Sequence, residues 1–316
     1  MIPIIDLQPL FSNETRGIQK IAAEIYQAYS TLGFAQVINH QVPQQIITDV
    51  YTASRDFHNL TLEEKNQIKY KAYLRGYLPI NIQKFTKSDL GAAKKPNQSE
   101  SFMLCSEPHD ARWQNSILGG KQVWPKQLPQ FKNQVLNYYW ALEKLSQKLI
   151  RAFSLALDLP ADYLDKYFTD PSIFLRLLYY PPISKNAPSD LFSAAPHTDY
   201  GFLTLLHQDE IGGLQVQVEG DKWIDVTPRS DALVLNTGQM IVVWSNGRLK
   251  ATPHRVINAS SDKPRYSIPY FYGCNLSTLV APLPSCVSAA NPPHFEPIAY
   301  GEHLEEMFLA NYAFGK

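Results

Sequence analysis

The sequence predicts an α+β fold with a mainly helical N-terminal part and a β-rich C-terminal part. Before roughly residue 170, apolar residues recur at spacings of three and four, which is typical of amphipathic helices. From Ser172 onward, short runs rich in β-branched, leucine and aromatic residues alternate with turn residues. Several short strands separated by turns indicate a β-sandwich or a barrel in the C-terminal part.

The predicted helices have recognisable boundaries. Gly33 follows the first apolar stripe and is a natural stop, and Thr61 with Glu64 fits a capping box at the start of a short helix. Helices are expected at 15–32, 43–60, after Thr61, at 129–157, 160–168 and, closing the chain, at 299–312. The apolar stripe in 129–157 is the longest, so we expect this helix to pack along a large buried surface.

The predicted strands concentrate after residue 172. Strands are expected at 2–7, 34–38, 173–180, 202–207, 213–218, 223–226, 232–237 and 265–273, with a hairpin turn at 219–222. Residues 66–127 are rich in Pro, Gly, Asn and Lys and lack periodicity, so we expect irregular structure with short strands over a pocket. The sequence therefore divides into 1–170 and 171–316, which we expect to form one compact unit.

Composition excludes several classes of partner. The formal net charge is +0 and the sequence pI is about 7.1, which gives no electrostatic footprint for nucleic acid or an anionic membrane. No stretch approaches the ~18 apolar residues of a spanning helix. The three cysteines, Cys105, Cys274 and Cys286, are too few for a disulfide framework. We expect a cytoplasmic monomer.

Residues 196–201 read Pro-His-Thr-Asp-Tyr-Gly and suggest a metal site. His197 and Asp199 stand two apart, so on an extended strand both side chains leave from the same face. A second histidine from a distant strand would complete two His and one carboxylate, the facial triad of non-haem Fe(II) oxygenases. Arg265 and Ser267 are also two apart, and a guanidinium beside a hydroxyl suits a carboxylate ligand.

Spacing alone leaves the metal ligands open. His207 and Asp209 form a second His-x-Asp pair a few residues downstream. For the distant histidine, His254 has rivals in His294, within a Pro-rich loop, and His303, within a charged helical stretch.

At these residues the sequence resembles the Fe(II)/2-oxoglutarate-dependent dioxygenases of the isopenicillin N synthase-like branch. Further fragments follow the order found in that family: 2–7, 33–40, 75–77, 100–102, 178–182 and 244–248. The resemblance therefore covers nearly the whole chain. It implies a double-stranded β-helix, or jelly roll, with flanking N-terminal helices and a C-terminal helix.

The resemblance also implies roles for individual residues. The metal ligands would be His197, Asp199 and His254, because the strand and the Gly-Gly-Leu turn that follow Asp199 match the family order. Arg265 and Ser267 would hold the distal carboxylate of 2-oxoglutarate, with Tyr180 near the co-substrate. The implied substrate-binding residues are Arg75, Tyr77, Phe102, Leu206 and Phe271. Among these, Arg75 would suit a substrate carboxylate.

The implied reaction uses Fe(II), 2-oxoglutarate and O2 to oxidise a small molecule, with hydroxylation as the default outcome and release of succinate and CO2. One alternative is an oxidase like isopenicillin N synthase, which has the same triad without 2-oxoglutarate. The chain lacks the glutamine that the synthase has near its C-terminus, which favours 2-oxoglutarate use. A second alternative is a non-catalytic jelly-roll module that binds a ligand. The three metal ligands with Arg265 argue against it, because a binding module has no need for an open iron site.

Overall fold

A large sheet draws its strands from both halves of the chain. The computed structural model describes residues 1–316 apart from 13–14, 89, 185, 221, 258–261 and 314–316. The strands of this sheet are β1 (Ile4–Asp6), β2 (Phe34–Ile38), β3 (Gly76–Leu78), β4 (Glu100–Cys105), β5 (Pro171–Tyr180), β7 (Leu203–Gln208), β10 (Ala232–Thr237) and β12 (Arg265–Asn275). Their spatial order is β1-β2-β10-β7-β12-β5-β4-β3. Strands from the N-terminal part thus extend both edges of a centre built by the C-terminal part.

A smaller sheet faces the large one. It consists of β6 (Ala194–His197), β11 (His254–Val256), β8 (Leu214–Val218) and β9 (Lys222–Asp225), in that order. An apolar cluster joins the sheets, with Leu178 and Leu206 from the large sheet against Leu214 and Val216 from the small one. A two-stranded pair, β13 (Leu279–Val280) and β14 (Ile298–Ala299), lies beside the C-terminal helix.

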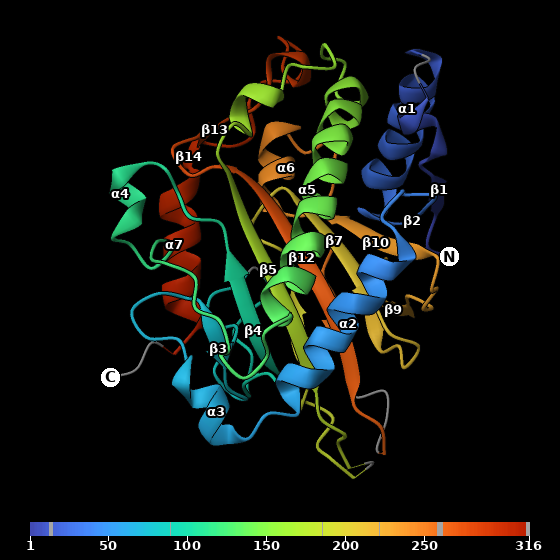
Figure 1. Ribbon diagram of the computed structural model, residues 1–316. Helices are drawn as coiled ribbons and strands as arrows, with labels where there is room; N and C mark the ends of the chain where they lie inside the picture. Colours follow the sequence, from blue (N-terminus) through green and yellow to red (C-terminus); the bar gives the residue numbers. More distant parts are fainter. Residues whose placement is uncertain (13–14, 89, 185, 221, 258–261, 314–316) are drawn as a thin grey trace.

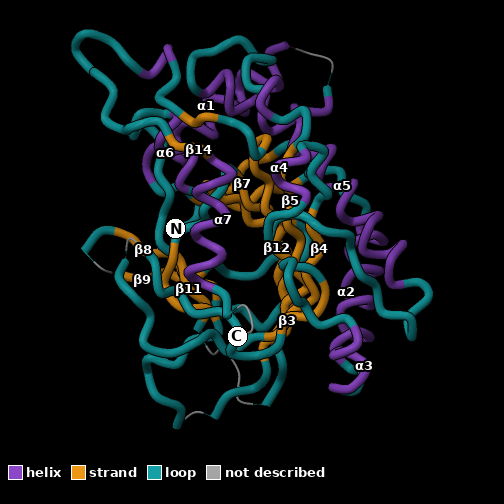
Figure 2. Tube along the Cα trace, turned by 90° about the vertical axis from the view of Figure 1, so that its left-hand side faces the viewer, coloured by secondary structure: helices purple, strands orange, loops and turns teal. Residues whose placement is uncertain are grey.

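Three helices cover the outer face of the large sheet: α1 (Thr15–Thr31), α2 (Gln44–His58) and α5 (Phe131–Ala156) (Figure 1). Figure 2 shows α2 and α5 on one side of the large sheet, with α7 (Tyr300–Asn311) and the small sheet on the other. The remaining α-helices are α3 (Leu62–Gln67), α4 (Ala111–Gln114) and α6 (Gln239–Trp244). Short 3-10 helices span Gln8–Phe11, Asp165–Tyr167 and Pro284–Cys286.

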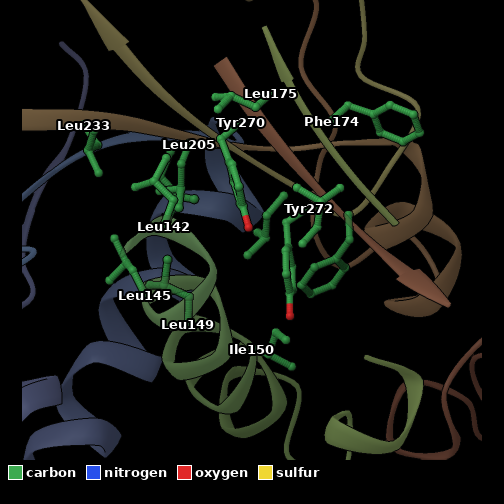
Figure 3. Packing of buried hydrophobic residues seen from close by; sticks show 14 of the residues in the cluster. Leu142, Leu145, Leu149, Ile150, Phe174, Leu175, Leu205, Leu233, Tyr270 and Tyr272 are labelled. Carbon is green, nitrogen blue, oxygen red and sulfur yellow. The ribbon is translucent and has the colours of Figure 1, made fainter. Parts of the chain in front are cut away.

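The alternation of side chains along the central strands separates a core from a cavity. On the outer face, Leu142, Leu145 and Leu149 of α5 lie toward Leu205 and Tyr270 of the sheet (Figure 3). Because successive side chains on a strand point to opposite faces, the neighbours of these core residues point between the two sheets. The inner face of β5 accordingly presents Phe174, Arg176, Leu178 and Tyr180, all of which line a cavity.

Most predicted elements are confirmed within a few residues. The helices expected at 15–32, 43–60, 129–157 and 299–312 are present, and Gly33 ends the first of them with a positive φ of 72°. Thr61 and Glu64 form the predicted capping box. The helix expected at 160–168 is wrong, because this stretch contains only the 3-10 turn Asp165–Tyr167. The turn expected at 219–222 includes Asp221, which lies outside the described residues.

Strands β3, β4, β6 and β11 were not individually expected. Each is short, at three to six residues, and β3 and β4 fall in the stretch that lacks periodicity. In the part of the chain that the structure describes, no helix is long and apolar enough to cross a membrane.

Candidate active site

A cavity of about 130 Å³ lies between the two sheets. Its walls carry apolar side chains and a few convergent polar groups, the usual composition of a small-molecule site. The charged residues among its described lining are Arg176, Asp199 and Arg265. His197 and His254 lie on the same wall as Asp199.

His197, Asp199 and His254, the three metal ligands that the family resemblance implied, lie together in the structure. Strand pairing places His254 of β11 directly opposite His197 of β6, with ring centroids 4.3 Å apart. Oδ1 of Asp199 lies 3.8 Å from Nε2 of His197 and 3.6 Å from Nε2 of His254. One ligand atom from each residue lies within 4.8 Å of the others. Within the described ranges, this is the one group of His, Cys, Asp and Glu side chains that meets that criterion.

The surrounding hydrogen bonds orient these three side chains for one ion. Nδ1 of His197 donates to the carbonyl of Ala195 at 2.8 Å, which leaves Nε2 as the ligand atom. Oδ2 of Asp199 accepts hydrogen bonds from the hydroxyl of Thr204 and, at 2.7 Å, from the amide of Asn236. Only Oδ1 therefore faces the two imidazoles, so the donor set of two nitrogens and one oxygen fits Fe(II) with open coordination positions.

The protonation of His197 and Asp199 also suits a metal site. By contrast, burial would lower the pKa of His254, but the Asp199 carboxylate outweighs it and raises that pKa, so a bound metal ion would replace a proton there. Burial and the neighbouring His254 lower the pKa of His197 to about 3, so its imidazole is neutral at neutral pH. Burial would raise the pKa of Asp199, but His254, His197 and Thr204 outweigh it and hold that pKa below its usual range. A neutral imidazole and an ionised carboxylate are the forms that bind metal ions.

The rival histidines lie elsewhere. Nδ1 of His207 is 2.9 Å from the hydroxyl of Tyr51, among the residues beneath α2. His294 contacts Asn291 on an exposed loop. His303 lies on α7 and is not part of the three-residue cluster.

A second polar group gathers around Arg265 on β12. Its guanidinium donates to Ser267 Oγ and to Gln208 Oε1, each at 3.1 Å, and lies 4.8 Å from the ring centroid of Tyr180. Ser267 Oγ in turn donates to the hydroxyl of Tyr180 at 3.3 Å. Arg265 is 4% exposed, and its Nε has no hydrogen-bond partner among the described residues. A buried cation whose described hydrogen-bond partners are neutral, on the wall of a cavity, is suited to an anionic ligand.

The five predicted substrate-binding residues divide into two groups. Leu206 and Phe271 line the cavity. Arg75, Tyr77 and Phe102 do not, because the outer layers of the fold hold each of them.

The contacts of these three explain their placement. The guanidinium of Arg75 donates to four backbone carbonyls: those of Cys105, Ser106, Leu118 and Gly119. The hydroxyl of Tyr77 donates to Glu100 at 2.6 Å. Phe102 packs against Phe57 and Phe131 in the aromatic core under α2 and α5.

Several cavity residues were missed from the sequence. Phe85 stacks on His197, with ring centroids 4.3 Å apart and an interplanar angle of 16°. Gln83 and Phe85 belong to a covering segment, residues 82–87, that hydrogen-bonds to the end of α7 through Asn311. Arg176 could have been found from the sequence, because it lies four residues before Tyr180 and so shares its face of β5.

Comparison with known proteins agrees with this geometry. The model of the 2OG-Fe(II) oxygenase superfamily matches residues 171–273, and that of the N-terminal region of non-haem dioxygenases in morphine synthesis matches residues 2–127. Homoarginine-6-hydroxylase 2-ODD-C23 of Glycine max is 33% identical, over 98% of this chain and 97% of that protein. The chain belongs to the 2-oxoglutarate/Fe(II) oxygenase superfamily.

Similar solved structures also include proteins with bound 2-oxoglutarate. A full-length Neurospora crassa protein in complex with alpha-KG superposes with a TM-score of 0.84 at 28% identity, covering 98% of this chain and 96% of that one. JOX2 in complex with 2OG, Fe and JA superposes with a TM-score of 0.79 at 30% identity, covering 95% and 83%. This member of the superfamily is therefore a dioxygenase that depends on Fe(II) and 2-oxoglutarate. The comparisons do not favour the oxidase alternative.

Proposed function

We propose that this oxygenase hydroxylates a small organic molecule at an iron held by His197, Asp199 and His254. The observation that carries the proposal is the convergence of their three ligand atoms within 4.8 Å on the wall of a largely apolar cavity. Relatives support a small substrate: one is a homoarginine hydroxylase, the Neurospora crassa protein was crystallised with thymine, and JOX2 was crystallised with JA.

We assign the distal carboxylate of 2-oxoglutarate to Arg265, with Ser267 and Tyr180 beside it. The guanidinium can bind a carboxylate in bidentate fashion, and the two hydroxyls offer further hydrogen bonds. Bound Fe(II) and 2-oxoglutarate would activate O2 at this site: one oxygen atom would enter succinate as 2-oxoglutarate loses CO2, and the other would oxidise the substrate.

The chain itself orients the reactants and limits access of water. Phe85 stacks on His197, and Phe34 lies edge-on to His254 at 5.3 Å, so both imidazoles are held between apolar surfaces. Leu206 and Phe271 add to the apolar lining of the cavity. A dry, shaped cavity of this kind protects a reactive centre from solvent.

We further infer that the two facing sheets form the jelly roll of this superfamily, and that 1–170 and 171–316 fold as one unit. The large sheet includes strands from both segments, which supports a single unit. Three free, buried cysteines support the prediction of a reducing compartment such as the cytoplasm. A monomeric state and the lack of a nucleic-acid partner stay predictions from the sequence.

Iron content and succinate formation test the proposed function. Anaerobically reconstituted protein is expected to bind one Fe(II) per chain and to convert 2-oxoglutarate to succinate in the presence of O2. His197→Ala and His254→Ala are expected to lose both properties. His207→Ala is the matched control, since it removes the histidine of the other His-x-Asp pair.

Two results would contradict the proposal. Normal iron content in His197→Ala, with none in His207→Ala, would mean that the other pair binds the metal. Substrate oxidation with O2 alone would instead establish an oxidase that needs no 2-oxoglutarate.

A further inference from the structure

A second arginine, Arg176, lines the same cavity from β5 of the large sheet. It is 6% exposed and projects from the inner face of β5, between Phe174 and Leu178 of the same face. Its Nε and Nη2 donate to Ser101 Oγ, at 3.3 and 3.0 Å. Its Nη1 donates to Gln83 Oε1 at 2.9 Å and to the hydroxyl of Tyr312 at 3.1 Å.

All of these hydrogen-bond partners are neutral. Arginines at the surface of the described chain do find carboxylates, because Arg151, Arg229 and Arg248 each contact an aspartate. A buried charge needs compensation far more than an exposed one does. Arg176 therefore keeps a positive charge in the cavity that the described side chains around its guanidinium do not neutralise.

The absence of a carboxylate partner is not sufficient by itself, as Arg75 shows. That guanidinium is also buried, but it is enclosed by four backbone carbonyls and does not reach the cavity. Arg176 differs because it lines the cavity and is held by side chains. Two of these partners, Gln83 and Tyr312, come from the covering segment and from the residue that follows α7.

The iron and the co-substrate do not compensate this charge. This step rests on the proposed function. Fe(II) and Arg265 together carry three positive charges, and Asp199 and the two carboxylates of 2-oxoglutarate carry three negative charges. Residues 176 and 180 are four apart on one strand, which separates their backbones by about 13 Å. A carboxylate held at Arg265, which pairs with Tyr180 across the sheet, is therefore too distant to serve Arg176 as well.

We propose that Arg176 binds a carboxylate of the primary substrate. Ser101, Gln83 and Tyr312 take four of its five N–H groups, so a carboxylate would bind through the remaining N–H of Nη2 or by displacing a neutral partner. A charge-assisted hydrogen bond in a buried setting is stronger than the neutral contacts that it would replace. Because Ser101 lies on β4 while Gln83 belongs to the covering segment, a carboxylate bound there would contact both the sheet and that segment. The substrate class is thus small organic acids, amino acids among them, with the oxidised carbon held toward the iron.

Matched acids and amides test this proposal. Protein loaded anaerobically with Fe(II) and 2-oxoglutarate is titrated calorimetrically with small aliphatic, aromatic and amino-acid carboxylates, each beside its primary amide. We expect the best acid to bind at least about 30-fold more tightly than its amide, the effect of removing one member of a desolvated charge pair. Arg176→Gln should abolish that preference. The same pairs are then compared for stimulation of succinate formation.

Control variants separate recognition from a structural effect. Arg265→Gln should lose affinity mainly for 2-oxoglutarate, whereas Arg176→Gln should lose it mainly for the acid. Tyr312→Phe removes a neutral partner of Arg176 and should keep the preference for acids. Arg176→Lys retains the positive charge and should keep part of the preference for acids. If Arg176→Gln does not fold, this variant tests whether the charge at position 176 recognises the acid.

The outcomes distinguish this inference from the proposed function. Wild-type protein that fails to bind Fe(II) and 2-oxoglutarate contradicts the proposed function. Wild-type protein that binds both, yet binds acids and amides equally, overturns only the assignment of Arg176. So does an Arg176→Gln variant that retains the wild-type preference for acids.

Discussion

Two carboxylates in this protein, the partly buried Glu100 and the buried Asp199, contact histidine side chains, yet only Asp199 is placed to bind a metal ion. Glu100 on β4 accepts from Tyr77 at 2.6 Å through one oxygen, and through the other contacts His58 at 3.0 Å and Lys65 at 2.8 Å. Asp199 has one oxygen held by hydrogen bonds, while the other stands 3.6 and 3.8 Å from two imidazole nitrogens. The first network is closed, and the second leaves room for an ion.

The histidines differ in the same way. Both ring nitrogens of His58 have partners, Glu100 and the carbonyl of Leu177, each at 3.0 Å. His197 and His254 each use Nδ1 for a backbone carbonyl and direct Nε2 toward Asp199. Residue type alone therefore does not make a metal site. What matters is whether the ligand atoms retain lone pairs that converge on one point.

The sharpest test of this contrast replaces each carboxylate by its amide. Asp199→Asn is expected to lose iron below detection and to abolish turnover, because it removes the one anionic ligand. Glu100→Gln is expected to retain stoichiometric iron. Iron is measured by metal analysis after anaerobic reconstitution and desalting. We interpret the closed network around Glu100 as structural, with no part in metal binding. Equal iron loss in both variants would contradict that interpretation.

A smaller effect is expected at the co-substrate end of the cavity. Arg265→Ala should raise the apparent KM for 2-oxoglutarate, because a buried carboxylate would lose its charged partner at a cost of about 2–5 kcal/mol. At about 1.4 kcal/mol per tenfold, this corresponds to a rise of about 30-fold or more. Succinate formation at varied 2-oxoglutarate measures it. A KM within a factor of two of wild type would remove Arg265 from the co-substrate site.

The residues that orient Asp199 should matter less than the ligand itself. Asn236→Ala removes the 2.7 Å hydrogen bond to Oδ2 and frees the carboxylate to rotate. Loss of such an outer partner typically costs about 10- to 100-fold in metal affinity or activity. Competition with a chelator of known affinity measures the change. Unaltered iron affinity would show that Thr204 alone is enough to hold the carboxylate.

The structure brings the three predicted metal ligands together but places only two of the five predicted substrate residues at the cavity, for a physical reason. His197 and Asp199 are neighbours on one chain segment, where β6 ends at His197, and the family resemblance separated them from the rival pair. Arg75 and Arg176 cannot be told apart by residue type. Whether an arginine lines the cavity depends on which groups, distant in the sequence, surround its side chain. The carbonyls around Arg75 belong to a stretch without periodicity, and Tyr312 reaches Arg176 only through the docking of α7.

The fold, too, could be predicted only where a local sequence pattern is long enough. Long helices and the central strands carry periodic signals over many residues, so they were predicted within a few positions. Strand β11 has only three residues, and β6 only four, so neither contains a full pattern of its own. A change of period near residue 170 led to the predicted division of the chain into 1–170 and 171–316. That β2 and β4 complete the sheet of the C-terminal part depends on long-range pairing, which local patterns do not report.

The closed network should show itself in stability against pH. Burial would raise the pKa of Glu100, but hydrogen bonds from His58, Lys65 and Tyr77 outweigh it and lower that pKa from 4.5 to about 2. A carboxyl group whose pKa is depressed by folding stabilises the protein above its unfolded pKa. That contribution is lost as the pH falls from about 4.5 toward 2.

Glu100→Gln should therefore destabilise the protein at neutral pH by about 1.5–3 kcal/mol, the usual contribution of hydrogen bonds to a charged group. Between pH 4.5 and 2 the gap between variant and wild type should narrow, because wild type loses the stabilisation that the variant already lacks. Urea unfolding of both proteins without metal, at steps across this range, measures the difference in free energy. Other carboxyl groups titrate in both proteins and cancel in that difference. A gap that stays constant down to pH 2 would mean that the charge of Glu100 contributes nothing to folding.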